Sequence, residues 1–210
     1  MKKLSSADIK LNHNLYQNFL EIGVDDGWTS EDKLGNFEQF LKICEYTNLP
    51  IEDASVLDVG SGTGDFAFFL QQHHVKQYIG IDIYEPAVDK AQMKYEFADF
   101  IVGDFLQMDL PQFDFVYSSG STTTKFDTDN YVVLEQWIRK MWILAKQGIV
   151  FNVLLEQYPN ETDENLFLYN RLKVIELAAL TVPESQMKYL IDDAGSGDGT
   201  EELHIYLYRL

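Results

Sequence analysis

The sequence has very little cysteine and no long apolar run. Its single thiol, Cys44, cannot form a disulfide within the chain or contribute to a metal site built from several cysteines. Cys44 lies in an apolar helical pattern, which favours a buried structural thiol. No stretch approaches the ~18 apolar residues of a membrane span, and residues 1–8 lack the apolar core of a secretion signal. We therefore expect a soluble cytoplasmic protein without a membrane partner.

Basic residues are also scarce. There are 16 lysines and arginines against 34 acidic residues, which gives a formal net charge of −18. Proteins that bind nucleic acids draw much of their affinity from basic contacts to phosphates, so we expect no DNA or RNA partner. The acidic field also disfavours anionic membranes, although salt screens it within ~8 Å.

The arrangement of apolar segments predicts one α/β domain over residues 1–210. Strands are expected near 55–59, 77–82, 98–102, 113–118 and 148–155, with helices near 64–74, 85–95 and 129–146 between them. Such alternation is typical of a parallel sheet covered on both faces. A helix near 170–180, capped by Asn170, precedes two final strands, 186–191 and 203–209. The aromatic stripe of the helix 129–146 favours a place in the core over a ligand-binding role.

The segment 56–64 reads VLDVGSGTG, an apolar strand that breaks into three glycines spaced two apart. Glycine permits positive φ angles and lets a ligand approach the backbone closely. A tight turn without a ligand is the alternative interpretation. The order G-x-G-x-x-G of a dinucleotide site is not met, because Asp65 occupies its last position. A phosphate-binding P-loop is excluded, since the chain has no G-K-[ST] tripeptide.

An acid two residues before a G-x-G-x-G run resembles the first motif of the class I S-adenosylmethionine-dependent methyltransferases. The resemblance continues in order through 78–83 (YIGIDI), 100–105 (FIVGDF) and 113–120 (FDFVYSSG). In that family, an acid at the place of Asp82 binds both ribose hydroxyls, and an apolar residue like Ile83 lies against the adenine. An acid like Asp104 lies near the adenine amino group.

The resemblance implies a Rossmann-like, doubly wound, seven-stranded and mostly parallel sheet with a C-terminal antiparallel hairpin. It also implies S-adenosylmethionine as the cofactor. The cofactor-binding residues it indicates are Asp58, Gly60, Ser61, Gly62, Gly64, Asp82, Ile83, Gly103, Asp104, Phe105 and Ser118. Candidate residues for the acceptor are Tyr16, Trp28, Ser119 and Asn152, the last of which is also explained as a satisfied buried amide. No metal site is expected, because the Asp/Gly-rich loop 192–200 lacks the spacing of a calcium site.

Helical patterns precede the first strand. One runs over 9–22, and a second follows a capping-box pattern at Thr29 and Asp32. We expect residues 1–50 to form a lid over a Rossmann-like core of residues 51–210, with Lys33 among the lid residues at the cofactor. The alternative is that these helices cap the sheet.

The function predicted is methyl transfer to a small-molecule acceptor. A cofactor-binding protein without catalysis, acting through a protein partner, is the alternative. A nicotinamide-dependent oxidoreductase conflicts with Asp65 in the glycine pattern. The motif [DN]-P-P-Y of amino-methylating enzymes does not follow the fourth strand. The sequence identifies no catalytic base: among the histidines, His13 of the lid is the one that could reach an acceptor, and an exposed lid residue is the simpler interpretation. The sequence leaves the oligomeric state open.

Overall fold

The computed structural model describes residues 4–21, 30–156, 165–193 and 201–210. Within them, seven strands form one sheet in the order β3-β2-β1-β4-β5-β7-β6. The strands are β1 Ser55–Val59, β2 Gln77–Asp82, β3 Asp99–Val102, β4 Phe113–Ser118, β5 Ala145–Leu154, β6 Gln186–Asp193 and β7 Glu201–Tyr208. Strands β1 to β5 pair in parallel, and β7 pairs antiparallel with both β5 and β6. The predicted mostly parallel sheet with an antiparallel hairpin is confirmed.

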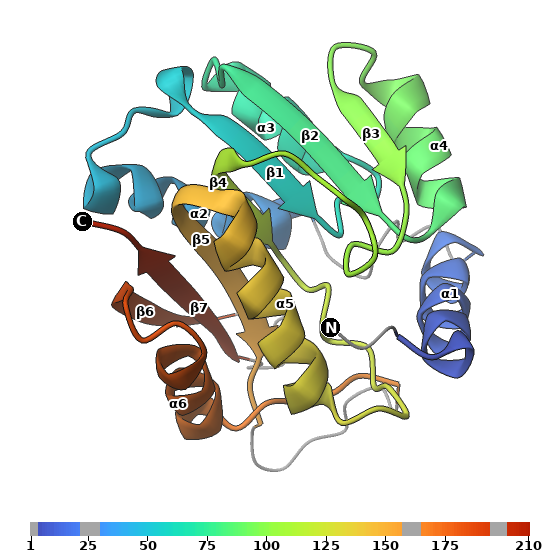
Figure 1. Ribbon diagram of the computed structural model, residues 1–210. Helices are drawn as coiled ribbons and strands as arrows, with labels where there is room; N and C mark the ends of the chain where they lie inside the picture. Colours follow the sequence, from blue (N-terminus) through green and yellow to red (C-terminus); the bar gives the residue numbers. More distant parts are fainter. Residues whose placement is uncertain (1–3, 22–29, 157–164, 194–200) are drawn as a thin grey trace.

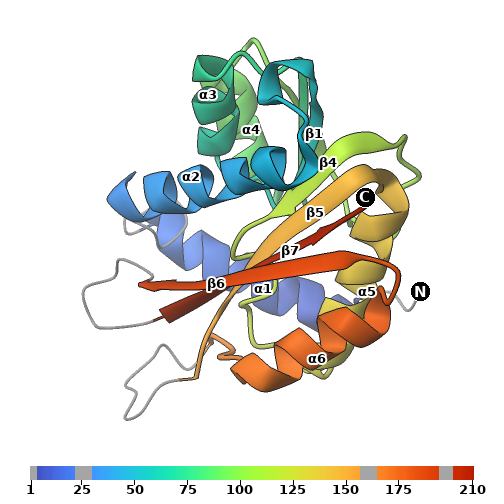
Figure 2. The same cartoon turned by 90° about the vertical axis from the view of Figure 1, so that its left-hand side faces the viewer.

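The helices are α1 Ser6–Glu21, α2 Ser30–Thr47, α3 Asp65–Gln72, α4 Glu85–Lys94, α5 Asn130–Leu144 and α6 Arg171–Thr181, with a short 3-10 turn at Ile51–Asp53. Helices α2, α3 and α4 cover one face of the sheet, and α5 and α6 cover the other (Figures 1 and 2). Helix α1 lies beyond the carboxyl ends of β1 to β3 (Figure 1). In open α/β sheets, that edge is where ligands bind.

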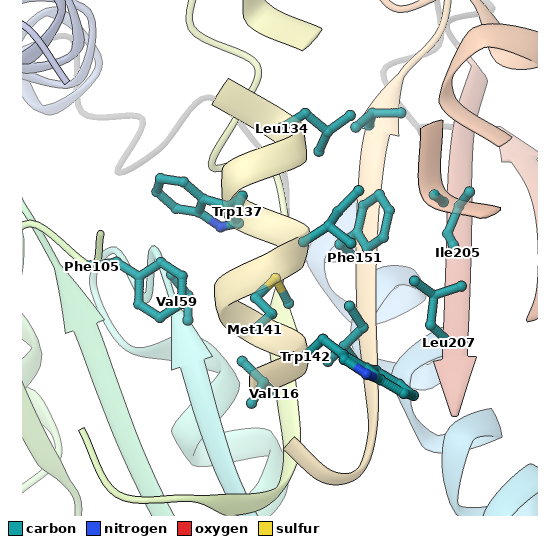
Figure 3. Close-up of a cluster of buried hydrophobic side chains, with 14 of the residues drawn as sticks. Val59, Phe105, Val116, Leu134, Trp137, Met141, Trp142, Phe151, Ile205 and Leu207 are labelled. Carbon is teal, nitrogen blue, oxygen red and sulfur yellow. The ribbon is translucent and has the colours of Figure 1, made fainter. Parts of the chain in front are cut away.

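On the face of the sheet that α5 and α6 cover, α5 carries the larger apolar stripe. Trp137 and Trp142 are 8% and 6% exposed, and Ile138 and Met141 are fully buried against β4 and β5. Figure 3 shows Leu134, Met141 and Trp142 directed toward the strand side chains, with Trp137 directed toward Phe105. The prediction that this stripe belongs to the core is confirmed.

Helix α2 forms part of the opposite core. Phe40 and Ile43 are fully buried there, among side chains from α3, β4 and β7. The Phe40 ring lies 5.1 Å from that of Phe66 and 5.1 Å from that of Tyr117. This helix therefore contributes to the apolar layer of the sheet as well as to its carboxyl edge.

Element boundaries follow the sequence patterns with one notable shift. Helix α5 ends at Leu144, and β5 begins at once with Ala145, three residues earlier than predicted. Ala145 pairs with Phe113, and Gln147 O accepts a hydrogen bond of 2.8 Å from Arg209 N. These strand contacts draw 145–147 out of the helix. Asn170 caps α6 as predicted, accepting from Lys173 N at 3.2 Å. The predicted capping residue Thr29 lies outside the described residues.

Candidate cofactor site at the carboxyl edge of the sheet

The glycine-rich loop joins β1 to α3 and turns through positive φ angles at Gly60 (81°), Gly62 (51°) and Gly64 (83°). A Cβ on Gly60 would lie 2.0 Å from Ser121 Oγ, and one on Gly64 would lie 2.6 Å from Phe100 Cζ. Both positions therefore require glycine on two grounds, backbone conformation and close packing. The amides of Gly60 and Ser61 donate to Ile81 O at 2.7 and 3.0 Å, which fixes the loop beside the end of β2.

Asp82 ends β2 and bridges two loops. Its Oδ2 accepts a hydrogen bond from Gly62 N at 2.9 Å, and its Oδ1 accepts one from Tyr84 N at 2.8 Å. Burial raises the pKa of Asp82, and these amide contacts act in the opposite direction. Each carboxylate oxygen can accept a further hydrogen bond. The carboxylate is thus held in one orientation with acceptor capacity to spare.

Asp58, the acid before the glycines, is 3% exposed. Burial raises its pKa to about 7; the hydrogen bond of 2.7 Å from the Tyr78 hydroxyl lowers it, and the neighbouring charge of Asp82 raises it further. A group with this pKa changes its charge near neutral pH. The site therefore contains one carboxylate whose ionisation a bound cation can shift.

Two adjoining cavities open at this edge. The first encloses about 620 Å³, part of it open to solvent. It is lined by Tyr16, Lys33, Asn36, Phe37, Asp58, Gly60, Ser61, Gly62, Asp65, Phe66, Asp82, Tyr117, Ser119 and Gly120. The second is lined by Leu4, Asn12, Tyr16, Val59, Gly60, Ile81, Asp82, Ile83, Gly103, Asp104, Phe105, Ser121, Phe126 and Trp137. Tyr16, Gly60 and Asp82 belong to both, so Asp82 stands where the two cavities meet.

The structure thus brings most of the predicted residues to one place. Gly64 and Ser118 line neither cavity: Gly64 is the N-cap residue of α3, and Ser118 lies behind the wall, where its Oγ accepts from Trp137 Nε1 at 3.2 Å. Asn152 also lies behind the wall and bonds to Ser119 and Gly120. Trp28 lies outside the described residues.

Sequence reasoning did not select several lining residues. Asn36 and Phe37 come from α2, and Asn12 comes from α1. One signal was present: Lys33, Asn36, Phe37 and Phe40 recur at the spacing of one helix face. The polar members of that face line the cavity, and Phe40 enters the core.

His13 lies on the second-cavity side of the site. Its Nε2 is 3.3 Å from Ile83 O, and its ring centroid is 5.4 Å from that of Tyr84. The described residues of the first cavity include no histidine. This position places His13 beside the loop after β2, away from Ser119.

Asp65 ties the lid helix to the glycine loop. Its carboxylate accepts from Lys33 Nζ at 2.7 Å, from Lys94 Nζ at 2.6 Å and from the Tyr95 hydroxyl at 2.7 Å. Burial alone would raise the pKa of Asp65, but these contacts lower it to about 2. Because Lys33 belongs to α2 and Asp65 begins α3, this ion pair sets the distance between the two helices at the cavity mouth.

The loop also has features that a polar ligand would satisfy. Ser61 Oγ is buried and has no hydrogen-bond partner among the described residues. It lies in the glycine cradle beside the carboxylates of Asp58 and Asp82. These features fit an adenosine-bearing cofactor whose hydroxyls are bound by a strand-end acid. The fold and the cavities define an α/β protein with a candidate cofactor site at the carboxyl edge of its sheet.

Comparisons with known proteins show what this chain is similar to. Residues 56–148 match the model of a methyltransferase domain. A demethylmenaquinone methyltransferase of Deinococcus radiodurans is 27% identical over 147 residues, which cover 68% of this chain and 54% of that protein. The chain therefore spans about half the length of this curated relative.

Solved structures share the fold across nearly the whole chain. Magnesium protoporphyrin IX methyltransferase from Synechocystis PCC 6803, solved with bound S-adenosylmethionine, gives a TM-score of 0.70 at 16% identity, with 100% of both chains covered. The 1,6-didemethyltoxoflavin-N1-methyltransferase of Burkholderia thailandensis, solved with S-adenosylhomocysteine, gives 0.72 at 15% identity, covering 100% of this chain and 93% of that one. The methyltransferase-domain model thus matches residues 56–148, and the fold of the whole chain is that of these solved methyltransferase structures.

Proposed function

We propose that this protein transfers the methyl group of S-adenosylmethionine to a small-molecule acceptor. The observation that carries the proposal is the convergence, at one edge of the sheet, of the glycine loop, Asp82 and Asp104 around two adjoining cavities. The relatives' names mention demethylmenaquinone, magnesium protoporphyrin IX and 1,6-didemethyltoxoflavin, all of them small molecules.

The residues divide between the cavities. Asp82 is proposed to bind the ribose hydroxyls, with Gly60, Ser61, Gly62 and Asp58 around the methionine portion in the first cavity. Ile83, Gly103, Asp104 and Phe105 are proposed to hold the adenine in the second, and Gly64 and Ser118 are proposed to support the loops from behind. Asp104 Oδ1 accepts from Leu106 N at 3.0 Å, which fixes this carboxylate at the mouth of the β3 loop. Tyr16 and Ser119 are proposed to contact the acceptor, with Asn152 supporting Ser119. Trp28 stays a prediction for the same role.

Catalysis in this proposal is mainly alignment. The bound sulfonium cofactor supplies an already activated methyl group. The chain's own residues orient the two reactants and exclude water. Positioning of this kind lowers the activation free energy by on the order of 7–11 kcal/mol. A positioned base accelerates a reaction by ~10²–10⁴-fold, which is a smaller effect.

The acidic surface and the single cysteine support a cytoplasmic enzyme that acts on a small molecule and not on nucleic acid. Within the described residues, no helix has the length and apolar character needed to cross a membrane. Residues 1–50 are proposed to act as a lid through α1, because Asn12 and Tyr16 from that helix line the cavities.

The test is methyl transfer itself. The protein is incubated with S-adenosylmethionine labelled in its methyl group and with a panel of small hydroxyl-, amine- and thiol-bearing acceptors. A methylated product that depends on the protein, and is lost with Asp82→Ala, is the expected result. Cofactor binding without turnover of any acceptor would instead support the alternative, a cofactor-binding protein that acts through a partner.

A further inference from the structure

Behind the first cavity lies a buried hydrogen-bonded network, of which the proposed function uses only the support that Asn152 gives to Ser119. Asn152, 3% exposed, donates from Nδ2 to Ser119 Oγ at 3.0 Å and to Glu202 Oε2 at 3.1 Å. Its Oδ1 accepts from Gly120 N at 2.8 Å. Glu202 lies on β7, opposite Leu154 of β5, and is 1% exposed. The network thus runs from the antiparallel hairpin to the loop after β4.

The chemistry of the partners fixes the orientation of the Asn152 amide. A backbone N–H can only donate, so Oδ1 faces Gly120, and Nδ2 is left to face Glu202 and Ser119. The second hydrogen of Nδ2 is therefore donated to Ser119 Oγ. Because Ser119 Oγ accepts this bond, its own hydrogen is left to be donated elsewhere.

The Tyr117 hydroxyl, the next polar group of the network, can accept that hydrogen. The Ser119 hydroxyl bonds to the Tyr117 hydroxyl, which lowers the pKa of that phenol against the larger rise that burial causes. The Tyr117 hydroxyl donates in turn to Asn36 O over a long 3.4 Å. Tyr117, Ser119 and Asn36 all line the first cavity. Two hydroxyl groups therefore stand side by side at its wall. Ser119 is partly exposed, whereas Tyr117 is 2% exposed and its hydrogen bond to Asn36 O is long.

The rest of this wall is aromatic. The Phe66 ring lies 4.4 Å from that of Tyr117 and 5.0 Å from that of Phe37, and Tyr16 lines the same space. The cation of the cavity, Lys33, is paired with Asp65 at 2.7 Å. The carboxylates Asp58 and Asp82 also face the cavity, which disfavours an anionic ligand.

Resting on the proposed function, we propose that Ser119 and Tyr117 form the acceptor subsite and that it takes an uncharged aromatic molecule bearing a hydroxyl or carbonyl oxygen. The Ser119 hydrogen turns from Tyr117 to the acceptor oxygen, so no group changes its protonation on binding. Asn152 and Glu202 are positioning residues: they keep Ser119 Oγ occupied as an acceptor, so that it presents a donor to the cavity. Phe37 and Phe66 supply the flat apolar surface on which the ring packs.

The subsite can be tested with small probes before any natural acceptor is known. The protein is saturated with S-adenosylhomocysteine and titrated with 4-methylphenol and, separately, with toluene, and binding is followed by ligand-observed saturation-transfer NMR. The two probes differ by the hydroxyl. We expect 4-methylphenol to bind about tenfold more tightly, the effect of one or two hydrogen bonds.

Variants assign this preference to the network. Ser119→Ala is expected to abolish most of the tenfold preference, Ser119→Thr to keep it, and Asn152→Ala to reduce it. Ser185→Ala, whose hydroxyl donates to Val182 O away from the cavities, is the matched control. Affinity for S-adenosylhomocysteine and the melting temperature, measured on each variant, show that the cofactor site and the fold are intact.

The proposal is overturned if the cofactor complex binds the two probes equally or binds neither. It is also overturned if Ser119→Ala, with its cofactor affinity unchanged, keeps the full preference for 4-methylphenol. A wild-type protein that does not bind S-adenosylhomocysteine at all contradicts the proposed function instead, so the two failures are distinguishable.

Discussion

At the scale of single residues, the site is built from side chains held by backbone amides and hydroxyls. Asp82 receives hydrogen bonds from Gly62 N and Tyr84 N, and Asp58 receives one from the Tyr78 hydroxyl. Unlike Asp82, Asp58 accepts its hydrogen bond from a side chain and not from a backbone amide. Asp58 is also nearly inaccessible to solvent, and this burial raises its pKa to about 7. Its charge is therefore sensitive to pH and to cations near neutrality.

This pKa predicts a specific dependence of stability on pH. In the unfolded chain, Asp58 ionises near the ordinary aspartate pKa of 3.8; in the folded chain its pKa is about 7. Between these pH values the folded state binds more protons than the unfolded state. The contribution of Asp58 to the free energy of unfolding therefore falls as the pH rises through that window. Through Asp58, the free energy of unfolding of the wild type falls by at most about 4 kcal/mol over this window, and Asp58→Asn abolishes this fall. Thermal melts from pH 4 to 8 should therefore decline less steeply for the variant.

The exposed Asp53→Asn is the control for this measurement. It should follow the wild-type curve. Parallel curves for Asp58→Asn and wild type would show that Asp58 ionises normally in the folded protein.

At the scale of elements, α1 is joined to the sheet by a few polar contacts. The fully buried Asp8 accepts from Asp127 N at 2.8 Å, from Thr128 N at 3.1 Å and from Thr128 Oγ1 at 2.7 Å. Asn12 Nδ2 donates to Thr124 Oγ1 at 3.2 Å. These contacts place the cavity-lining side of α1 above the carboxyl ends of the strands.

We predict that Asp8→Ala loosens α1 and weakens cofactor binding. Removing the carboxylate leaves the part-buried amides of 127 and 128 without their acceptor, a cost of about 1 kcal/mol or more. Affinity for S-adenosylhomocysteine should fall several-fold or more, and hydrogen exchange over 6–21 should accelerate. Asp53→Ala serves as the exposed control. Faster exchange in α1 with unchanged cofactor affinity would show that the helix caps the sheet without contributing to the site.

The elements themselves were largely predictable from sequence. The strand-helix alternation, the C-terminal hairpin and the Asn170 cap follow from local patterns, because each depends on neighbours within a few residues. The boundary between α5 and β5 does not, since the pairing of Ala145 with Phe113 is a contact between distant parts of the chain. The helical stripe that contains Phe40 indicates burial, and Phe40 is buried, but the stripe does not name the side chains against which the helix packs.

For the site, the sequence predicted the residues that end strands or form the glycine loop, since these positions follow from the order of the strands. It did not predict the network of Asn152 and Glu202, because the two residues are distant in sequence and meet through the register of β5 and β7. The pairing of Asp65 with Lys33 depends equally on tertiary contacts. Such contacts are set by three-dimensional packing, which a motif in one segment does not encode.

At the scale of the whole molecule, the charge predicts that this protein binds no nucleic acid. The net charge of −18 disfavours approach to a phosphate backbone, and Lys33 of the first cavity is paired with Asp65. Non-specific DNA binding by basic proteins has dissociation constants of about 10⁻⁴–10⁻⁶ M at physiological salt. Fluorescence anisotropy with a labelled DNA duplex and a labelled RNA hairpin should show no binding at ~10⁻⁴ M protein. Salt-sensitive binding in this range would contradict a purely small-molecule role.

The central claim is that the carboxyl edge of the sheet binds S-adenosylmethionine with Asp82 at the ribose. Calorimetric titration of wild type and Asp82→Ala with S-adenosylmethionine, S-adenosylhomocysteine and NAD tests it most directly. We predict that wild type binds the first two ligands and not NAD. A hydrogen bond to a charged group contributes about 1.5–3 kcal/mol and Asp82 can accept two from the ribose, so Asp82→Ala should weaken binding by tens-fold or more. Unchanged affinity in a folded Asp82→Ala protein, or binding of NAD in place of the sulfonium cofactor, would contradict the claim.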